Sequence, residues 1–418
     1  MADGDRQGML SPYRVLDLTD EKGLLCGKLL GDLGADVIKI EPPGGDVTRG
    51  IGPFHHDEVH LEKSLFWLAY NTSKRGITLA LETRDGREIF ERLAKTADFV
   101  VESFPPGYLD RLGLGYAALD RINSGLIMVS ITPFGQTGPY RDYKAPDIVA
   151  WAIGGHTYQV GSQDRPPLRI SHHSHSFLHA AGDAAVGAMV ALRHRRLTGR
   201  GQHVDVSIQE AVLHSTDQAE TTGRWDAIGL NRRREDSWPR ADLKRTALWP
   251  CLDGHVIWIY WFGLSARWSE PLVEWMDEEG ELDDFLRDFD FAGFDVAGMT
   301  QEILERIAEP TRRFFLKRTK AELYHRALTH RIQLYPVATS ADIAADEQLA
   351  GRGFWVDLDH PELGGSIRYP GAFAQASAAP VRVERRPPLI GEHNREIYQE
   401  ELGIAADRLA AMSESGII

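Results

Sequence analysis

The sequence predicts an α/β fold in which a mostly parallel sheet is covered by helices on both faces. Short apolar runs typical of strands alternate with helical patterns through the first half of the chain. Repeated strand–helix–strand units with short joints make the strands parallel and place helices on the two faces. The length of 418 residues favours two domains, and the apolar fraction of 43% is ordinary for a folded globular protein.

The first of these units lies near the N-terminus. An apolar run at residues 13–18 predicts a strand, and leucines on one face of residues 23–33 predict a helix that ends at Gly34. Residues 35–41 predict the next strand, so the crossover between the two strands should be right-handed. The same alternation then predicts strands at 76–81, 98–103, 126–132 and 203–207, and helices at 85–94 and 177–196.

The second half of the chain has a different character. Residues 217–246 are polar, contain three consecutive arginines and predict a linker. Residues 247–328 combine a tryptophan-rich strand pair with acidic amphipathic helices, which predicts a second folded region. The remainder is punctuated by Pro, Gly and Ala, and predicts a short strand and a final helix, at 366–369 and 394–402.

Composition and charge exclude several classes of protein. The net charge of −14 argues against nucleic acid as a partner, because duplex binding requires a basic face. The two cysteines, Cys26 and Cys251, lie in apolar runs and give no disulfide framework. No apolar run approaches the roughly 18 residues of a membrane span, and residues 1–12 have no apolar signal core. We therefore expect a soluble protein of the reducing cytoplasm with no membrane partner.

Three loops that follow predicted strands are candidates for ligand binding. They lie at residues 41–49, 103–111 and 133–144, at the edge of the sheet where open α/β folds bind ligands. Each loop mixes Gly or Pro with a basic residue, as a phosphate-bearing ligand requires. Exposed basic loops are also common on ordinary solvated surfaces, so the loops alone leave both interpretations open.

Six segments resemble one enzyme family, in order and along most of the chain. They include V-L-D-L-T with L-L-G-D-L-G-A-D-V-I-K-I-E-P-P-G-G-D, A-D-F-V-V-E-S-F-P-P-G-Y-L-D-R-L-G and T-G-R-G-Q-H-V-D-V-S. The six lie within residues 15–46, 71–81, 97–113, 134–140, 198–207 and 388–397. The family is the class III coenzyme A-transferases, which include formyl-CoA transferase, carnitine CoA-transferase and α-methylacyl-CoA racemase.

The resemblance implies a domain arrangement and an assembly. Residues 1–216 and the C-terminal part of 329–418 would form a large Rossmann-like domain with a parallel sheet. Residues 247–328 would form a smaller inserted α+β domain, with linkers at 217–246 and at the start of 329–418. Two subunits of this family thread through each other, so the expected partner is a second copy or a related subunit in an interlocked dimer.

The resemblance also implies that coenzyme A or acyl-CoA binds as substrate at the sheet edge, with no metal. Arg111 and Lys144 are the basic candidates for its phosphates, since guanidinium and ammonium groups both bind phosphate. Arg111 could instead form a structural ion pair with Asp110 or a neighbouring acid. The nucleotide and pantetheine would lie near Thr78, Leu79, Ala80, Leu81, Ser103, Phe104 and Pro105.

The chain departs from the family at the catalytic residue. In the family an aspartate at the start of the long helix attacks the thioester, and a carboxylate nucleophile divides one difficult step into easier ones. Counted back from Thr198, that position is Phe177, and one deletion would move it to Leu178. Neither side chain can form an anhydride. Asp183 is the nearby acid, but it falls a turn or more inside the predicted helix.

The same stretch is rich in histidine, at His172, His173, His175 and His179. Their spacing matches no zinc site. His175 and His179 are candidates for general acid–base chemistry, because imidazole titrates near neutrality. Asp183 is a candidate for the nucleophile. A polar, solvated loop is the alternative.

Two further departures concern family elements outside the long helix. The glycine-rich flap of the family aligns with residues 258–262, which are bulky and apolar and cannot approach an intermediate as glycine backbone does. The racemase His before the aspartate that follows G-P-Y is replaced by Pro146, before Asp147, which disfavours racemisation.

These departures lead to one functional hypothesis with two alternatives. The chain would be the non-nucleophilic subunit of a heteromeric CoA-transferase of the benzylsuccinate type, with the catalytic aspartate on a partner subunit. Coenzyme A would move from a succinyl-CoA-like thioester to a free acid resembling an aryl-succinate, beside the aromatics Phe177, Trp258, Tyr260, Trp261 and Phe262. The alternatives are a self-sufficient homodimeric transferase, lyase or hydrolase, and a non-enzymatic paralogue that binds CoA or assembles with a partner.

Overall fold

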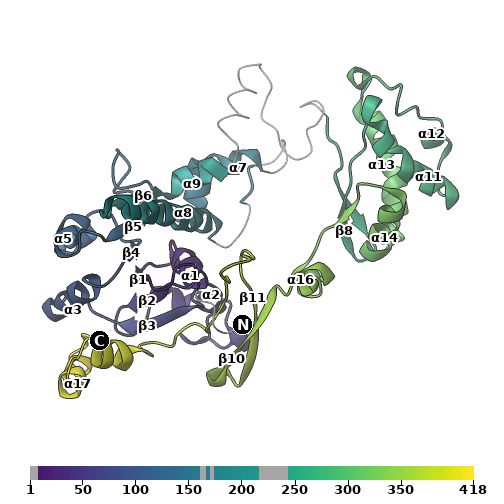
Figure 1. Cartoon of the computed structure of the whole chain (residues 1–418). Helices are drawn as coiled ribbons and strands as arrows, with labels where there is room; N and C mark the ends of the chain where they lie inside the picture. Colours follow the sequence, from purple (N-terminus) through teal and green to yellow (C-terminus); the bar gives the residue numbers. More distant parts are fainter. Residues whose placement is uncertain (1–7, 161–165, 170–173, 216–242) are drawn as a thin grey trace. The chain divides into compact units, whose positions relative to one another are not determined.

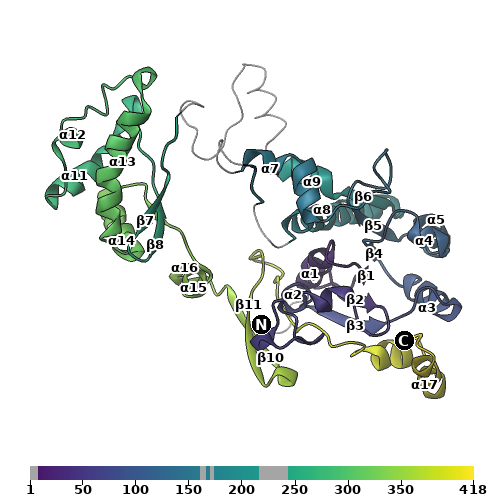
Figure 2. The ribbon, with the colours of Figure 1, turned by 180° about the vertical axis from the view of Figure 1, so that it is seen from behind.

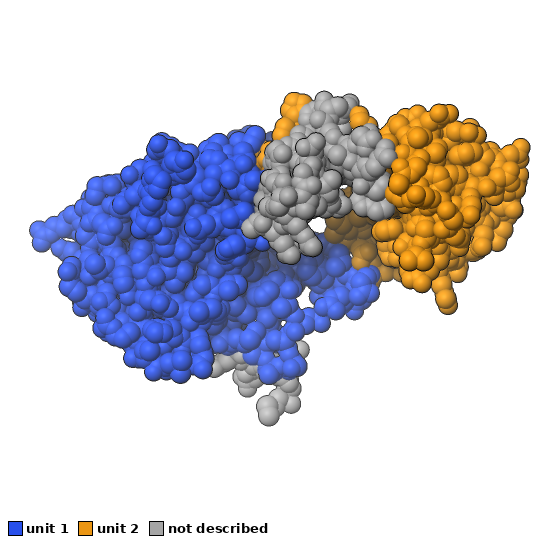
Figure 3. Space-filling model, turned by 90° about the horizontal axis from the view of Figure 1, so that it is seen from above, with its two compact units in different colours: residues 1–156, 171–217, 348–418 blue, residues 157–170, 218–347 orange. Residues whose placement is uncertain are grey.

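The computed structural model describes residues 8–160, 166–169, 174–215 and 243–418. The chain divides into two compact units, shown in blue and orange in Figure 3. The large unit contains Met1–His156, Ser171–Asp217 and Gln348–Ile418, and the small unit contains Thr157–Ile170 and Gln218–Glu347. The linker expected at 217–246 lies mostly outside the described residues.

The large unit is built on a six-stranded parallel sheet with the strand order β3-β2-β1-β4-β5-β6 (Figure 1). The chain first builds the sheet outward from β1 to β3 and then returns to the other side of β1. The sheet therefore has a topological switch point between β1 and β4, where the loops after the two strands diverge. The strands are β1 (Arg14–Leu18), β2 (Asp36–Glu41), β3 (Lys74–Thr78), β4 (Phe99–Glu102), β5 (Ile127–Thr132) and β6 (His203–Ser207).

Helices cover both faces of this sheet (Figures 1 and 2). One face carries α1 (Leu24–Asp32), α6 (Asp147–Ile153), the 24-residue α8 (His175–Thr198) and α9 (Ile208–Ser215). The buried side of α8 is mostly alanine, which lets this long helix lie close to the strands. The opposite face carries α3 (Arg84–Ala94), α4 (Tyr108–Arg111), α5 (Tyr116–Ile122), a π-helix (Arg395–Glu401) and α17 (Ala406–Glu414). The predicted α/β class with a parallel, Rossmann-like sheet is thus confirmed.

The remaining elements of the large unit flank the sheet. Helix α2 (Leu65–Tyr70) follows two 3₁₀ turns (Val47–Gly50 and His55–Asp57). Helix α7 (His156–Gln159) follows α6 at the boundary of the units, and its residues after His156 belong to the small unit. A hairpin of β10 (Trp355–His360) and β11 (Gly365–Pro370), joined by a 3₁₀ turn (Pro361–Leu363), packs its Tyr369 with Trp67. Helix α16 (Glu347–Gly351) precedes this hairpin.

Two sequence predictions in the large unit were wrong in detail. The strand expected at 76–81 begins earlier, at Lys74, and ends at Thr78. Its first two side chains are charged but almost fully buried, because Lys74 pairs with Asp17 and Arg75 pairs with Asp36. The final helix is not the one expected at 394–402, since α17 follows it.

The small unit has its own sheet and core. Strands β7 (Leu248–Cys251), β8 (Gly254–Ile257) and β9 (Tyr335–Pro336) form an antiparallel sheet. Its helices are α11 (Glu270–Glu278), α12 (Asp284–Arg287), α13 (Gln301–Leu316), α14 (Lys320–His330) and α15 (Ser340–Ala344), with 3₁₀ turns at Gly263–Trp268 and Val296–Gly298. Trp258, Tyr260 and Phe262 are 1%, 3% and 7% exposed and pack in this core. Tyr260 also lines a cavity of about 460 Å³ beside α13. Within the described residues, we find no helix with the length and apolarity to cross a bilayer.

Candidate functional site

A cavity of about 460 Å³ opens at the switch point of the large sheet. We call it the switch-point cavity. It lies at the carboxyl ends of β1, β4 and β5, and the segment 141–146 and the start of α8 complete it. Its lining comprises Asp20, Glu21, Lys22, Ser103, Phe104, Pro105, Pro106, Pro133, Arg141, Asp142, Tyr143, Lys144, Ala145, Pro146 and Phe177.

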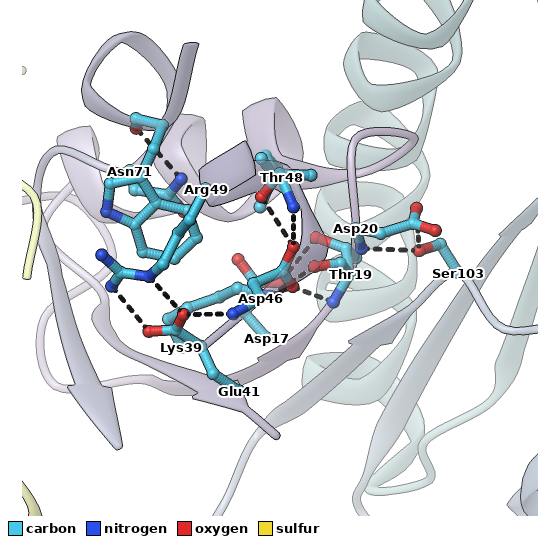
Figure 4. Close-up of polar contacts among 12 residues, drawn as sticks. Asp17, Thr19, Asp20, Lys39, Glu41, Asp46, Thr48, Arg49, Asn71 and Ser103 are labelled. Carbon is cyan, nitrogen blue, oxygen red and sulfur yellow. Dashed lines mark hydrogen bonds and ion pairs between the residues drawn. The ribbon is translucent and has the colours of Figure 1, made fainter. Parts of the chain in front are cut away.

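The loops after β1 and β4 are joined directly across the switch point (Figure 4). The backbone N–H of Asp20 donates to Ser103 Oγ at 2.9 Å, and Ser103 Oγ donates to Asp20 Oδ1 at 2.8 Å. The backbone N–H of Lys22 donates to the same Asp20 oxygen at 3.1 Å, and the Lys22 ammonium pairs with the Asp20 carboxylate. The two loops therefore form one rim of the cavity with a fixed relative position.

A buried group of charges supports this rim from below (Figure 4). Asp17 accepts hydrogen bonds from the N–H and the hydroxyl of Thr19, at 2.9 and 2.7 Å, and pairs with Lys74 Nζ at 2.8 Å. Lys39 Nζ donates to the Thr19 carbonyl and lies 3.3 Å from Asp46 Oδ2. Burial alone would raise the pKa of Asp17, but the charges of Lys74 and Lys39 outweigh it and hold that pKa below its ordinary value.

Arg49 is the basic residue of the loop at 41–49, and it faces inward rather than toward a ligand (Figure 4). Its guanidinium is fully buried and pairs with Glu41 through Nε at 2.6 Å and Nη2 at 2.8 Å. It also pairs with Glu62, donates to the carbonyl of Pro388, and stacks 3.8 Å from the centre of the Trp67 ring. This loop is thereby fixed to the C-terminal part of the chain.

Four of the residues expected to contact coenzyme A meet in the switch-point cavity: Ser103, Phe104, Pro105 and Lys144. Arg141, also in the lining, was not predicted, although it lies only three residues before Lys144 in a loop that the sequence did identify. Asp20, Glu21 and Lys22 were missed as well, although the loop after β1 also places a basic residue, Lys22, beside a glycine, Gly23.

The other expected contact residues lie outside this lining. Thr78, Leu79 and Leu81 are buried and Ala80 is half-buried, at and beyond the end of β3, an edge strand. The C-terminal segment covers them, since Asn394 bonds the N–H and hydroxyl of Thr78 and the Ala80 N–H donates to the Ile417 carbonyl. Arg111 is exposed at the end of α4, with its guanidinium 5.8 Å from the centre of the Tyr108 ring.

The start of α8 has an apolar side chain, Phe177, at the position where we expect the nucleophile of the family. Phe177 is 2% exposed, belongs to the core beneath the sheet and borders the cavity. The first turn of α8 contains no acidic residue. Its backbone is instead held from outside the helix, because Asp147 Oδ1 accepts from the N–H of Ser176 at 2.9 Å and from its hydroxyl at 2.7 Å. The carboxylate nearest this helix start is therefore 5% exposed and engaged in holding it.

One further carboxylate, Glu21, reaches the start of α8 from the cavity side. Ser174 Oγ lies 3.4 Å from Glu21 Oε2. Burial, with the neighbouring charge of Asp20, raises the pKa of Glu21 above its ordinary value.

The histidines expected to be catalytic do not line the cavity. The His179 ring lies 5.6 Å from the Trp151 ring, edge on, and burial lowers the pKa of His179. His175 is the first residue of α8, and Asp183 is exposed in its third turn. His172 and His173 lie outside the described residues. The described part of the chain contains no cluster of three His, Cys, Asp or Glu side chains that could hold a metal ion.

The cavity combines a charged rim with an apolar wall. The rim holds three cations, Lys22, Arg141 and Lys144, and three acids, Asp20, Glu21 and Asp142. Lys22 pairs with the Asp20 carboxylate, and Asp142 lies 3.4 Å from the Arg141 guanidinium. Aromatic and proline side chains form the rest of the wall, at Phe104, Pro105, Pro106, Pro133, Tyr143 and Phe177. A phosphate group could pair with Arg141 or Lys144, and an acyl chain could lie along the apolar wall.

Comparison with known proteins places the chain among coenzyme A-transferases. Residues 10–394 match the family model described as CoA-transferase family III. The chain is 37% identical over 391 residues to the succinyl-CoA:(R)-benzylsuccinate CoA-transferase subunit BbsE of Thauera aromatica, covering 93% of each. It is 33% identical to the succinyl-CoA–D-citramalate CoA-transferase of Chloroflexus aurantiacus, covering 98% of each. A CAIB/BAIF family protein from Brucella suis has a similar structure, with a TM-score of 0.80 and 29% identity over 94% of this chain and all of that one.

Proposed function

Because the chain belongs to CoA-transferase family III, we propose that it is a subunit of an enzyme that moves coenzyme A from a succinyl-CoA-like thioester to a free carboxylic acid. The observation that carries this proposal is the switch-point cavity, where Arg141 and Lys144 stand beside an apolar wall at the ligand-binding edge of the sheet. Succinyl-CoA is named as a substrate of both relatives.

The chain would act as the non-nucleophilic subunit, with the catalytic aspartate on a related partner in an interlocked assembly. Phe177 supports this role, because an apolar side chain that is 2% exposed occupies the helix start where the resemblance leads us to expect an aspartate. Asp147 cannot replace that aspartate without releasing Ser176 from two hydrogen bonds. The similarity to a protein described as a subunit agrees with a heteromer.

The acceptor acid would resemble an aryl-succinate. The name of the Thauera relative includes benzylsuccinate, and the cavity wall contains Phe104, Tyr143 and Phe177, which suit an aromatic ring. Lys144 and Arg141 would contact the phosphates of coenzyme A. Arg111 and residues 78–81 remain our proposed contacts for the nucleotide end.

The test compares the chain alone with the chain co-expressed with a related subunit that carries the family aspartate. Coenzyme A exchange is assayed between succinyl-CoA and benzylsuccinate, and acyl-enzyme is trapped with hydroxylamine and located by mass spectrometry. We expect activity only in the co-expressed complex, with the adduct on the partner's aspartate. An adduct on this chain alone would refute the proposal, and absence of activity in both preparations would favour a non-enzymatic role.

A matched variant addresses the self-sufficient alternative. Asp183→Asn removes the carboxylate of α8 that could serve this chain as nucleophile, at an exposed position where the change should not disturb packing. Activity of the complex should be unchanged within twofold. A loss of activity and of the adduct in this variant would instead assign the nucleophile to Asp183.

A further inference from the structure

A second, smaller cavity of about 260 Å³ adjoins the switch-point cavity, and Pro105 lines both. We call it the relay cavity. Its polar lining comes from the ends of three neighbouring strands and from the segments that cover them, including Glu102, Asp110, Tyr116, Ser130, Gln136 and His203. Gln136 Nε2 is buried here and has no hydrogen-bond partner within the structure.

Three of these side chains form a row across the sheet because of its register. Glu102 of β4 lies opposite Ser130 of β5, and Ser130 lies opposite Asp205 of β6. His203 precedes Asp205 by two residues and so points to the same face. Ser130 Oγ lies 2.8 Å from His203 Nε2, and the Ser130 hydroxyl also favours the ionised Glu102 carboxyl and so lowers its pKa. Glu102, Ser130 and His203 therefore lie in one row, and the His203 ring stacks on the Tyr116 ring with the ring centroids 5.6 Å apart.

The inner end of this row holds the wall of the switch-point cavity. Glu102 is 5% exposed, and its Oε2 accepts from the backbone N–H of Phe104 at 2.7 Å. Phe104 and the adjoining Pro105 line the switch-point cavity. The strength of the hydrogen bond between Glu102 and the Phe104 N–H therefore affects the position of the β4 loop relative to a bound ligand.

Glu102 can change its charge in the neutral range. Burial raises the pKa of Glu102 to about 7, and the nearby charge of Asp20 also raises it. The hydrogen bonds from Ser130 and Phe104 and the charge of Lys22 lower this pKa, but by less than burial raises it. The titratable groups that face it from the relay cavity are His203, Asp110, Tyr108 and Tyr116. A carboxylate accepts a hydrogen bond about twice as strongly as a neutral oxygen, so protonation would weaken the bond to Phe104.

We propose that Glu102 is a positioning residue for the β4 loop of the switch-point cavity, and that Ser130 and His203 carry its proton to and from the His203 end of the relay cavity. When Glu102 is ionised, it accepts from Phe104 N–H and from the Ser130 hydroxyl, while His203 Nε2–H donates to Ser130 Oγ. On protonation, a proton from the relay cavity binds His203 Nδ1, the Nε2 proton passes to Ser130, and the Ser130 proton passes to Glu102. His203 is then neutral with its proton on Nδ1, so each proton is accounted for.

The inference rests on the proposed binding of acyl-CoA, so its test has one arm without ligand. In the unliganded protein, hydrogen exchange of the Phe104 amide, corrected for its intrinsic rate, should be about fivefold slower at pH 8 than at pH 6. Glu102→Gln should remove this difference, whereas Glu88→Gln, an exposed carboxylate on α3, should retain it. Equal protection at both pH values in the wild-type protein, or an unchanged response in Glu102→Gln, would overturn the proposal.

The second arm measures affinity for dephospho-CoA, which lacks the phosphate monoester that itself titrates near pH 6. The dissociation constant should be about fivefold lower at pH 8 than at pH 6 in the wild-type protein, and independent of pH in Glu102→Gln. His203→Lys, whose ammonium only donates to Ser130, should favour ionised Glu102 and move the transition to lower pH. A transition that stays in place would refute the part assigned to His203. Failure to bind at any pH would count against the proposed function, while the exchange arm still tests Glu102.

Discussion

Removal of the Asp147 side chain should release the start of α8 and deform the switch-point cavity. Asp147 Oδ1 accepts from the N–H and the hydroxyl of Ser176, which is fully buried. A hydrogen bond to a charged group contributes about 1.5 to 3 kcal/mol, and the alanine variant leaves two buried donors without this acceptor. The carboxylate also lies at the positive end of a 24-residue helix, which adds about 0.3 to 1 kcal/mol.

We therefore expect Asp147→Ala to destabilise the first turns of α8 by about 3 to 5 kcal/mol. Two milder variants should destabilise α8 by smaller amounts. Ser176→Ala removes only the hydroxyl donor and should cost about 1 kcal/mol. Asp147→Asn keeps an acceptor oxygen but loses the charge, and should cost about 1 to 2 kcal/mol.

Native-state hydrogen exchange measured on peptides from α8 suits this test, because it reports local opening in a chain of two units that need not unfold together. Amides in the first turns of α8 should exchange at least about a hundredfold faster in Asp147→Ala than in the wild-type protein. Peptides from α3, on the opposite face, serve as the internal reference. Exchange in α8 within threefold of wild type, or equal effects of Ala and Asn, would refute the reasoning.

Three further predictions concern the buried charges and the basic rim. Arg49→Met should destabilise the large unit by about 3 to 5 kcal/mol in urea unfolding, because it leaves the Glu41 carboxylate buried without its ion-pair partner. Adding Glu41→Gln to this variant should recover at least half of the lost stability. Glu102 carries a folded-state pKa of about 7, above its ordinary value of 4.5, so its ionisation opposes folding. Wild-type stability relative to Glu102→Gln should therefore fall by about 3 kcal/mol as pH rises from 4.5 through 7, and a pH-independent difference would contradict this assignment. Lys144→Ala should raise the KM for succinyl-CoA in the complex about tenfold with little change in kcat, while Lys95→Ala, exposed at the end of α3, should change neither.

Much of the large unit could be predicted from the sequence because its strands are short apolar runs. Strand β6 was predicted with its observed bounds, and β1, β2, β4 and β5 to within a residue or so. Strand β3 was misplaced because it begins with Lys74 and Arg75, whose charges argue against a buried strand. Their partners Asp17 and Asp36 are distant in sequence, so no local pattern reveals that the charges are neutralised.

The candidate site was predicted in part for a similar reason. The β4 and β5 loops carried visible Gly, Pro and basic residues, which led to Ser103, Phe104, Pro105 and Lys144. The loop after β1 carries Lys22 and Gly23 but was not recognised, because it reaches the cavity only through the sheet order that brings β1 beside β4.

The sequence by itself determined the α/β alternation, the sheet edge that carries the candidate site, and a long helix with a phenylalanine and no acidic residue in its first turn. These are properties of residue type and of spacing along the chain. Only the tertiary structure decided which charges are buried in pairs, that Asp147 holds the start of α8 from 29 residues away, and that Glu102, Ser130 and His203 form one row. Each of those contacts joins separate strands or helices. Its energy depends on how deeply the two groups are buried and on how they are oriented, and the packing of the sheet determines both.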